Sequence, residues 1–127
     1  MSPSSFKYFA HKIKTKDGEF DSKKEYQRFL QLNKMLAAGE ISDLKLQPSF
    51  ELIPAQREPD TIGPRGGVKK GKVLERAVNY IADFSYVQNG KLVVEDVKGF
   101  RDSTAYDVFV IKRKLLLYLK GIRVKEI

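Results

Sequence analysis

The chain contains no cysteine, which excludes disulfide scaffolds, zinc fingers, thiol nucleophiles and iron–sulfur sites. Its one histidine, His11, cannot build a two-histidine metal site or a nuclease centre of the His-Asn-His type. The sequence also lacks a signal peptide and any apolar run of about 18 residues, so we expect a cytoplasmic protein that neither spans a membrane nor is secreted. Any catalysis must therefore rely on carboxylates, lysines, serines and a bound metal ion.

The length and charge of the chain indicate one basic domain. Its 127 residues suffice for a single hydrophobic core, so we expect one domain over 1–127. Lysine and arginine number 24 against 16 aspartate and glutamate residues, a net charge of +8 that favours nucleic acid as the partner. Two segments stand out. The first is a basic N-terminal arm over 1–20 with a turn at Asp17-Gly18, and the second is a flexible loop over 55–72 with five basic residues, two acidic residues and four glycines.

Caps, turns and hydrophobic periodicity predict two helices and four strands. Ser22 and Glu25 form a capping-box pattern at the start of the first helix, which ends at Gly39. Thr104 is the expected cap of the second helix, and Gly121 follows its end. The inward side chains of that helix should be Phe109, Leu115, Leu116 and Leu119. In chain order we expect a helix over 22–38, strands over 44–53, 73–87 and 91–98, a helix over 106–119 and a strand over 122–127.

The strongest chemical pattern lies in the hairpin around Asn89-Gly90. A two-residue turn there fixes the strand register and brings Asp83 directly opposite Asp96. Two facing carboxylates repel each other, and a bound divalent cation removes that repulsion. Carboxylates with open positions for water and phosphate oxygens suit Mg²⁺, with Mn²⁺ able to replace it. Lys98 shares a strand face with Asp96 and can orient a water molecule or stabilise transition-state charge. The alternative is an ordinary ion-pair ladder on an exposed sheet face.

Five segments in order resemble the PD-(D/E)xK nuclease superfamily, and more narrowly a small phage-encoded branch of endonucleases and Holliday-junction resolvase relatives. The segments are FDSKKE (20–25), LQPSFELIP (46–54), YIADFSY (80–86), VVEDVKG (93–99) and VIKRKLL (110–116). The resemblance covers about residues 8–126. It implies an α/β fold with a restriction-endonuclease-like core, in which a mixed central sheet is flanked by helices in the order α-β-β-β-α-β. The sequence departs from the motif at Ala82, where the superfamily has proline. Because a proline side chain cannot bind a metal, the departure leaves the implied mechanism unchanged.

The resemblance also implies roles for four residues. Asp83 and Asp96 would be metal ligands, Lys98 the catalytic lysine, and Glu25 the helix carboxylate that reaches the metal directly or through water. For Glu25 the alternative is purely structural, because a capping-box glutamate bonds back to the backbone N–H of Ser22. The implied activity is that of a Mg²⁺-dependent endodeoxyribonuclease acting on branched DNA, in the cytoplasm of a bacterial host if the protein is phage-encoded. A homodimer is implied as well, because resolvases cut two strands related by a two-fold axis.

Further residues offer contacts to DNA. Gln47 on the first strand and Lys112 on the inner side of the second helix can approach a scissile phosphate. Their structural alternatives are a polar strand-edge residue and a lysine that extends its ammonium group to solvent. In the loop, the basic residues that can contact the phosphate backbone are Arg65, Lys69, Lys70 and Lys72, unless the loop is only a solvated linker. Two other functions stay open: a single-strand or flap nuclease with the same site, and a non-catalytic nucleic-acid-binding module.

Overall fold

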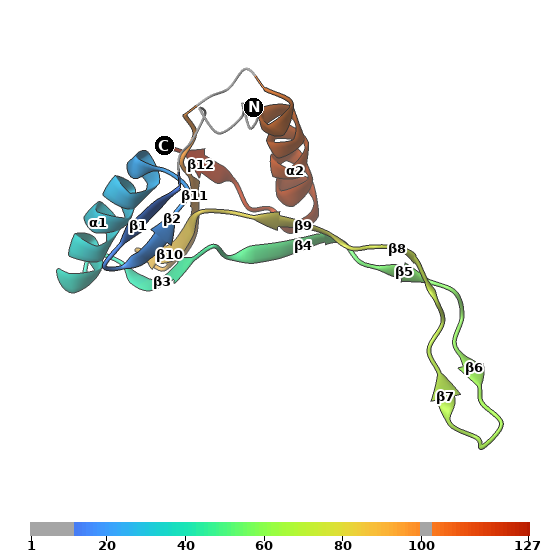
Figure 1. Cartoon of the computed structure of the whole chain (residues 1–127). Helices are drawn as coiled ribbons and strands as arrows, with labels where there is room; N and C mark the ends of the chain where they lie inside the picture. Colours follow the sequence, from blue (N-terminus) through green and yellow to red (C-terminus); the bar gives the residue numbers. More distant parts are fainter. Residues whose placement is uncertain (1–11, 100–102) are drawn as a thin grey trace.

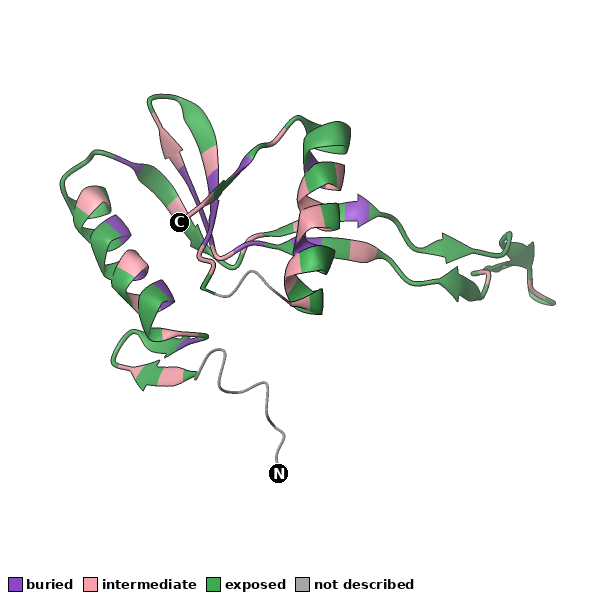
Figure 2. Cartoon of the chain, turned by 90° about the horizontal axis from the view of Figure 1, so that it is seen from above, coloured by how far each residue is buried: buried purple, intermediate pink, exposed green. Residues whose placement is uncertain are grey.

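A four-stranded sheet between two helices forms the body of the protein. A computed structural model describes residues 12–99 and 103–127. The strand order of the sheet is β12-β11-β10-β3. These strands are β3 (Ser42–Leu46), β10 (Phe84–Gln88), β11 (Lys91–Asp96) and β12 (Val124–Glu126). Because β11 pairs with β12 in parallel and the other pairs are antiparallel, the predicted mixed central sheet is confirmed. The helices α1 (Lys23–Ala37) and α2 (Thr104–Lys120) lie on its two sides (Figures 1 and 2).

Both helices begin at serine caps. Ser22 caps α1, where its hydroxyl accepts a hydrogen bond from the Glu25 backbone N–H at 3.1 Å, as the capping pattern predicts. The cap of α2 is Ser103 and not Thr104, because the Ser103 hydroxyl accepts from the Tyr106 N–H at 3.1 Å. The prediction that Leu119 points inward is also wrong, since its side chain is 48% exposed. The face of α2 that reaches the sheet is narrow and is centred on its two buried residues, Phe109 and Leu116.

Two of the expected strands are each interrupted, and the two interruptions lie side by side in the fold. The strand expected over 44–53 is interrupted at Gln47-Pro48, and β4 (Ser49–Ile53) follows the interruption. Gln47 has a φ of 51°, which a continuous strand does not allow, and Pro48 has no N–H to donate. The strand expected over 73–87 contains β8 (Val73–Glu75), then β9 (Val78–Ile81), and then β10 after a break at Ala82-Asp83. Backbone hydrogen bonds from Gln47 to Asp83 (2.9 Å) and from Ala82 to Pro48 (3.0 Å) hold the two breaks side by side.

Beyond β4 and β9, the chain forms a long two-stranded arm that projects from the body (Figure 1). The expected loop over 55–72 is therefore not irregular: it contains paired strands. The arm strands are β5 (Gln56–Arg57), β6 (Thr61–Ile62), β7 (Val68–Lys69) and β8 (Val73–Glu75). β5 pairs with β8 and β6 with β7, all antiparallel. The glycines of this segment favour turns, and one of them does form a turn: Gly66 lies at the arm's end with a φ of 85°.

The N-terminal hairpin lies next to α1. It is made of β1 (Ile13–Thr15) and β2 (Gly18–Phe20), and the predicted Asp17-Gly18 turn joins them. Residues 1–11 lie outside the described residues, and with them His11 and most of the expected basic arm. Phe20 at the end of β2 is buried against α1, so this hairpin is anchored where α1 begins.

The two faces of the sheet carry separate hydrophobic cores. The core on the α1 side contains Phe20, Phe29, Leu32, Ile41, Phe84 and Tyr86. The core on the α2 side contains Leu52, Tyr80, Ala82, Val94, Phe109, Leu116 and Val124. Along β11, Val93 packs with the first core and Val94 with the second, as the alternation of a strand requires. Glu95 therefore faces α1, and Asp96 faces α2, which agrees with the predicted division of this strand.

Candidate functional site

The hairpin register brings Asp83 to the end of β11, as predicted. Its strand pairs run from Gln88 with Lys91 to Phe84 with Glu95. Asn89 and Gly90 have φ values of 53° and 76°, the positive pair that a type I′ turn requires. One residue beyond the last pair, Asp83 donates its N–H to the Glu95 carbonyl at 3.2 Å. The Asp83 Oδ2 accepts from the Val97 N–H at 2.7 Å, so its carboxylate lies against the strand that carries Asp96.

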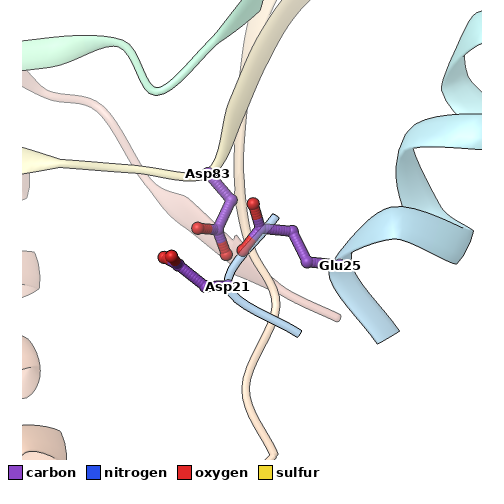
Figure 3. A group of neighbouring side chains, drawn as sticks. All are labelled: Asp21, Glu25 and Asp83. Atoms are coloured by element: carbon purple, nitrogen blue, oxygen red, sulfur yellow. The ribbon is translucent and has the colours of Figure 1, made fainter. Parts of the chain in front are cut away.

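Three carboxylates from separate elements converge at this point (Figure 3). Asp83 comes from the break between β9 and β10, Glu25 from the first turn of α1, and Asp21 from the residue before the Ser22 cap. One oxygen of each of these carboxylates lies within 4.8 Å of the others. Glu25 is buried with 5% exposure, and Phe29 one turn later fixes that face of α1 against the sheet. The Glu25 side chain therefore reaches the strands, as the functional interpretation of this residue expects.

Burial and neighbouring negative charge raise the pKa values of two of these acids, Asp83 and Glu25. Burial, then the hydrogen bond and the negative charge of Asp96, raise the pKa of Asp83 to about 9. Burial, then the charge of Asp21, raise the pKa of Glu25 to about 7, against the opposing effect of a hydrogen bond to Asp83. Asp83 therefore favours a bound proton at neutral pH, and Glu25 is close to half protonated there, unless another positive charge takes the proton's place.

Asp96 lies beside this group but has other partners. The Tyr80 hydroxyl donates a hydrogen bond to Asp96 Oδ2, and the Lys98 Nζ lies 3.5 Å from the same oxygen. Burial and this hydrogen bond raise the pKa of Tyr80, so its hydroxyl stays a donor. Asp96 thus adjoins Asp83 as predicted, and it is outside the group of three whose oxygens converge within 4.8 Å.

Lys98 is held on the α2 side of the sheet. Its Nζ lies 3.8 Å from the centroid of the Phe109 ring, a cation–π contact, in addition to its ion pair with Asp96. Its backbone N–H donates to the Ile127 carbonyl at 3.3 Å, and its carbonyl accepts from the Lys24 ammonium at 2.8 Å. Both ends of the residue are therefore fixed, and the ammonium group is directed toward Asp96.

Two hollows meet at Asp83. The larger, of about 340 Å³, lies between β9 and α2; its charged lining residues are Asp21, Asp83, Asp96, Lys98 and Lys112. The smaller, of about 160 Å³, is lined by Glu25, Gln47 and Asp83 among others. The structure therefore brings Gln47 and Lys112 to the site, where the Lys112 Nζ donates to the Asn79 carbonyl at 2.9 Å. We call the larger hollow the acidic groove.

The basic residues of the expected loop are elsewhere. All four are exposed on the arm or its turn: Arg65, Lys69, Lys70 and Lys72. The arm projects away from the body of the protein (Figure 1), whereas the acidic groove lies in that body, between β9 and α2. A role for them in a common site would need a substrate long enough to reach both places.

Two residues of the site, Asp21 and Tyr80, are not predicted from the sequence. Asp21 stands four residues before Glu25, but it precedes the helix, so no helical face associates the two. Tyr80 could have been found from strand alternation, because it lies two residues before Ala82 and faces α2 with it.

One family model matches nearly the whole chain. The model described as "Protein of unknown function (DUF1064)" matches residues 5–125. No curated protein and no solved structure matches the chain significantly. Over residues 12–99 and 103–127, neither helix has the length and apolar character needed to cross a bilayer.

Proposed function

The chain belongs to the DUF1064 family, and we propose that its acidic groove makes it a metal-dependent endonuclease that hydrolyses phosphodiester bonds in DNA. The observation that carries the proposal is the convergence of Asp21, Glu25 and Asp83 within 4.8 Å, next to Asp96 and Lys98, in a protein of net charge +8. A basic surface attracts the polyanion, and the acidic group at its reactive point needs a cation before a phosphate can approach.

The donor atoms fit a hard divalent cation. All three converging side chains offer carboxylate oxygens, which Mg²⁺ and Mn²⁺ prefer over nitrogen or sulfur ligands. The raised pKa values of Asp83 and Glu25 support the same choice, because burial and neighbouring carboxylates disfavour their charged forms and a bound cation would offset both effects. Asp83 and Glu25 would hold the ion, with Asp21 and Asp96 completing its surroundings. A divalent cation bound there supplies charge neutralisation at the phosphate and a lowered pKa for an attacking water.

The lysines of the groove then have distinct tasks. The Lys98 ammonium, fixed by Asp96 and the Phe109 ring, neutralises charge that develops on the phosphate oxygens or orients the attacking water. Lys112 on α2 and Gln47 beside Asp83 contact the phosphates on either side of the cleaved bond. The preferred substrate is branched DNA of the Holliday-junction type, bound by a homodimer. This choice rests on the sequence resemblance.

A non-catalytic DNA-binding module is the weaker proposal. Buried carboxylates that face a groove repel the phosphate backbone, and binding alone gives no reason to place several of them together. A nuclease for single strands or flaps uses the same groove and differs only in the substrate. The choice among nucleases is therefore a question of substrate shape.

The test is a cleavage assay in which single-stranded, duplex, flap and four-way-junction DNA are compared in parallel with Mg²⁺, Mn²⁺ or EDTA. We expect cleavage of at least one substrate that depends on metal and is lost in Asp83→Asn. The matched control is Asp43→Asn, because Asp43 is an exposed carboxylate on β3 with a φ of 52°, which asparagine also tolerates. Absence of metal-dependent cleavage on all four substrates would overturn the proposal.

A further inference from the structure

The arm has no core of its own. Between Gln56 and Glu75 its residues are exposed on both faces of the ribbon, apart from Gly63 and Gly71, which are half-buried (Figure 2). Its large apolar side chains are also exposed: Ile62 at 71%, Val68 at 68%, Val73 at 46% and Leu74 at 60%. A two-stranded ribbon without a covered face is only marginally stable in water. The described part of the chain therefore leaves the apolar side chains of the arm largely uncovered.

The middle of the arm is nevertheless built as a defined structure. The Arg57 Nη1 donates to the Gly71 carbonyl at 2.9 Å, and the Gly71 N–H donates to Asp60 Oδ1 at 2.9 Å. The Glu58 N–H donates to the Lys72 carbonyl at 2.9 Å. A Cβ on Gly71 would lie 1.8 Å from the Glu58 carbonyl oxygen, so only glycine allows the two strands to approach here. These contacts join the strands between the two short paired segments and keep the arm extended.

The end of the arm has the charge that a polyanion needs. Residues 61–72 contain four basic residues and no acidic residue. A tight turn, closed by the Gly66 N–H to the Gly63 carbonyl at 3.0 Å, places Arg65 at the tip. Just behind it, Ile62 and Val68 are direct strand partners and form an exposed apolar pair. This combination of cations around a small apolar patch matches a nucleic-acid duplex, whose backbone is charged and whose groove floor is apolar in part.

The arm begins at the acidic groove, so the length of the arm sets the distance between the groove and the basic end of the arm. Asn79, Tyr80 and Ile81 of β9 line the groove, and the arm leaves the body immediately before β9. Val78 is the eleventh residue after Gly67 at the arm's end. At about 3.3 Å per residue, an extended strand of this length spans about 36 Å. That is about one helical turn of B-form DNA, roughly 10 base pairs.

We propose that the arm docks on the DNA duplex about one helical turn from the bond at the acidic groove. Its two-stranded ribbon has the width that the major groove admits, with Arg65 and Lys69 on phosphates and the Ile62–Val68 pair toward the groove floor. This inference rests on the proposed function and deepens it: the substrate must be double-stranded for about 10 base pairs on one side of the cleaved bond. Single-stranded DNA cannot satisfy both surfaces, because a flexible strand does not hold them at this spacing.

The first experiment measures cleavage on substrates whose duplex flank is shortened stepwise from about 20 to about 4 base pairs, on each side in turn. For the wild type we expect kcat/KM to fall at least about tenfold when one particular flank drops below about 10 base pairs. The variant Arg65→Ala/Lys69→Ala should have a lowered kcat/KM even with long flanks, and this kcat/KM should not depend on flank length. Its kcat, the rate at saturating DNA, should stay near that of the wild type. The matched control is Lys34→Ala/Lys91→Ala, which removes two exposed lysines, one in the last turn of α1 and one at the start of β11, that do not line the acidic groove; this variant should behave as the wild type. Wild-type length dependence in the arm variant would overturn the inference.

The second experiment measures binding without cleavage and separates the inference from the proposed function. In the Asp83→Asn background with EDTA, the affinity for duplexes of about 6 to 20 base pairs is measured by fluorescence anisotropy at several salt concentrations. Loss of Arg65 and Lys69 should reduce the slope of log affinity against log salt by roughly 2, since each phosphate contact contributes about 0.9. If no substrate is cleaved but the slope falls as expected, the proposed nuclease activity is wrong and the proposal that the arm binds DNA stands. If the slope of log affinity against log salt is unchanged, or if the arm variant changes only the oligomeric state measured by sedimentation, the arm does not contact DNA.

Discussion

Arg28 on α1 donates two hydrogen bonds to the Glu95 carboxylate on β11, from Nε to Oε1 at 2.8 Å and from Nη2 to Oε2 at 2.6 Å. Glu95 is completely buried, and the Tyr86 hydroxyl donates to it as well. Burial alone would raise the pKa of Glu95, but the bonds from Arg28 and Tyr86 outweigh it and lower that pKa. Arg28 follows Glu25 on α1 and Glu95 precedes Asp96 on β11, so this pair fixes the helix and the strand that supply the site.

Loss of this pair should destabilise the fold strongly. In Arg28→Met the Glu95 carboxylate stays buried without its cation, which costs about 3–5 kcal/mol at neutral pH. Urea denaturation followed by circular dichroism measures the loss. Arg113→Met is the control, because the Arg113–Glu126 pair at 2.9 Å is more exposed on both sides and should cost about 1 kcal/mol or less. The additional change Glu95→Gln should restore part of the stability in the Arg28 variant, and no restoration would contradict the account of an unpaired buried charge.

The stabilisation from Glu95 should also disappear in acid. Because its folded pKa is lowered, its contribution is present above its unfolded pKa and is lost as the pH falls through the folded value. In Arg28→Met the cation no longer opposes the effect of burial, so the pKa of Glu95 rises and its carboxyl takes up a proton at a higher pH than in the wild type. The difference in unfolding free energy between the wild type and Arg28→Met should therefore be largest at high pH and shrink steadily as the pH falls from about 7 to about 4. A difference that stays constant down to pH 2 would mean that Arg28 acts through packing and not through charge.

For Asp83 the sign is opposite. Its pKa is raised to about 9, so the metal-free protein binds a proton there that the unfolded chain releases near pH 4. Stability should therefore fall as the pH rises from about 4 to about 9, and Glu25, with a pKa of about 7, adds to this fall. Mg²⁺ should counter it, because a cation replaces the proton, so the melting temperature should rise with millimolar Mg²⁺ more at pH 8.5 than at pH 5.5. A metal effect that is absent or equal at both pH values would contradict a carboxylate metal site.

Asp83→Asn should separate stability from activity. Asparagine resembles the protonated acid and carries no charge toward Asp96, so the metal-free variant should be more stable than the wild type at pH 8 by about 1–3 kcal/mol. Cleavage should be abolished, because the site loses a carboxylate on which the metal depends. Thermal unfolding with EDTA and a cleavage assay with Mg²⁺ check both halves. A variant that cleaves like the wild type would show that Asp83 is not part of a catalytic site.

The parts of the fold and the site that sequence predicts are those with a local cause. Asn89-Gly90 determines its own turn and hence the register that brings Asp83 to Asp96, and Ser22 determines where α1 begins. The break at Gln47 has no such signal beyond the neighbouring proline, because a positive φ at glutamine follows from how the two sheets join. Asp21 is similar: it reaches Glu25 only because the N-terminal hairpin packs beside α1. The glycines of the arm predict an irregular loop because they suit turns, whereas Gly71 is required by the close approach of two strands.

Lys98 should contribute to catalysis and not to metal binding. Its ammonium lies 3.5 Å from Asp96 and 3.8 Å from the Phe109 ring centroid, and it is outside the three converging carboxylates. In Lys98→Met the aliphatic stem still packs on Phe109, but the positive charge beside the phosphate is gone, so cleavage at saturating DNA should fall by about 10²–10³. The rise in melting temperature with Mg²⁺ should remain.

Lys112→Met is the matched control, since its Nζ bonds the Asn79 carbonyl at the edge of the groove and its loss should weaken DNA binding more than turnover. If Lys98→Met also abolishes the response to Mg²⁺, the lysine holds Asp96 in place for the ion; if turnover is unchanged, the charge that assists the reaction comes from another residue.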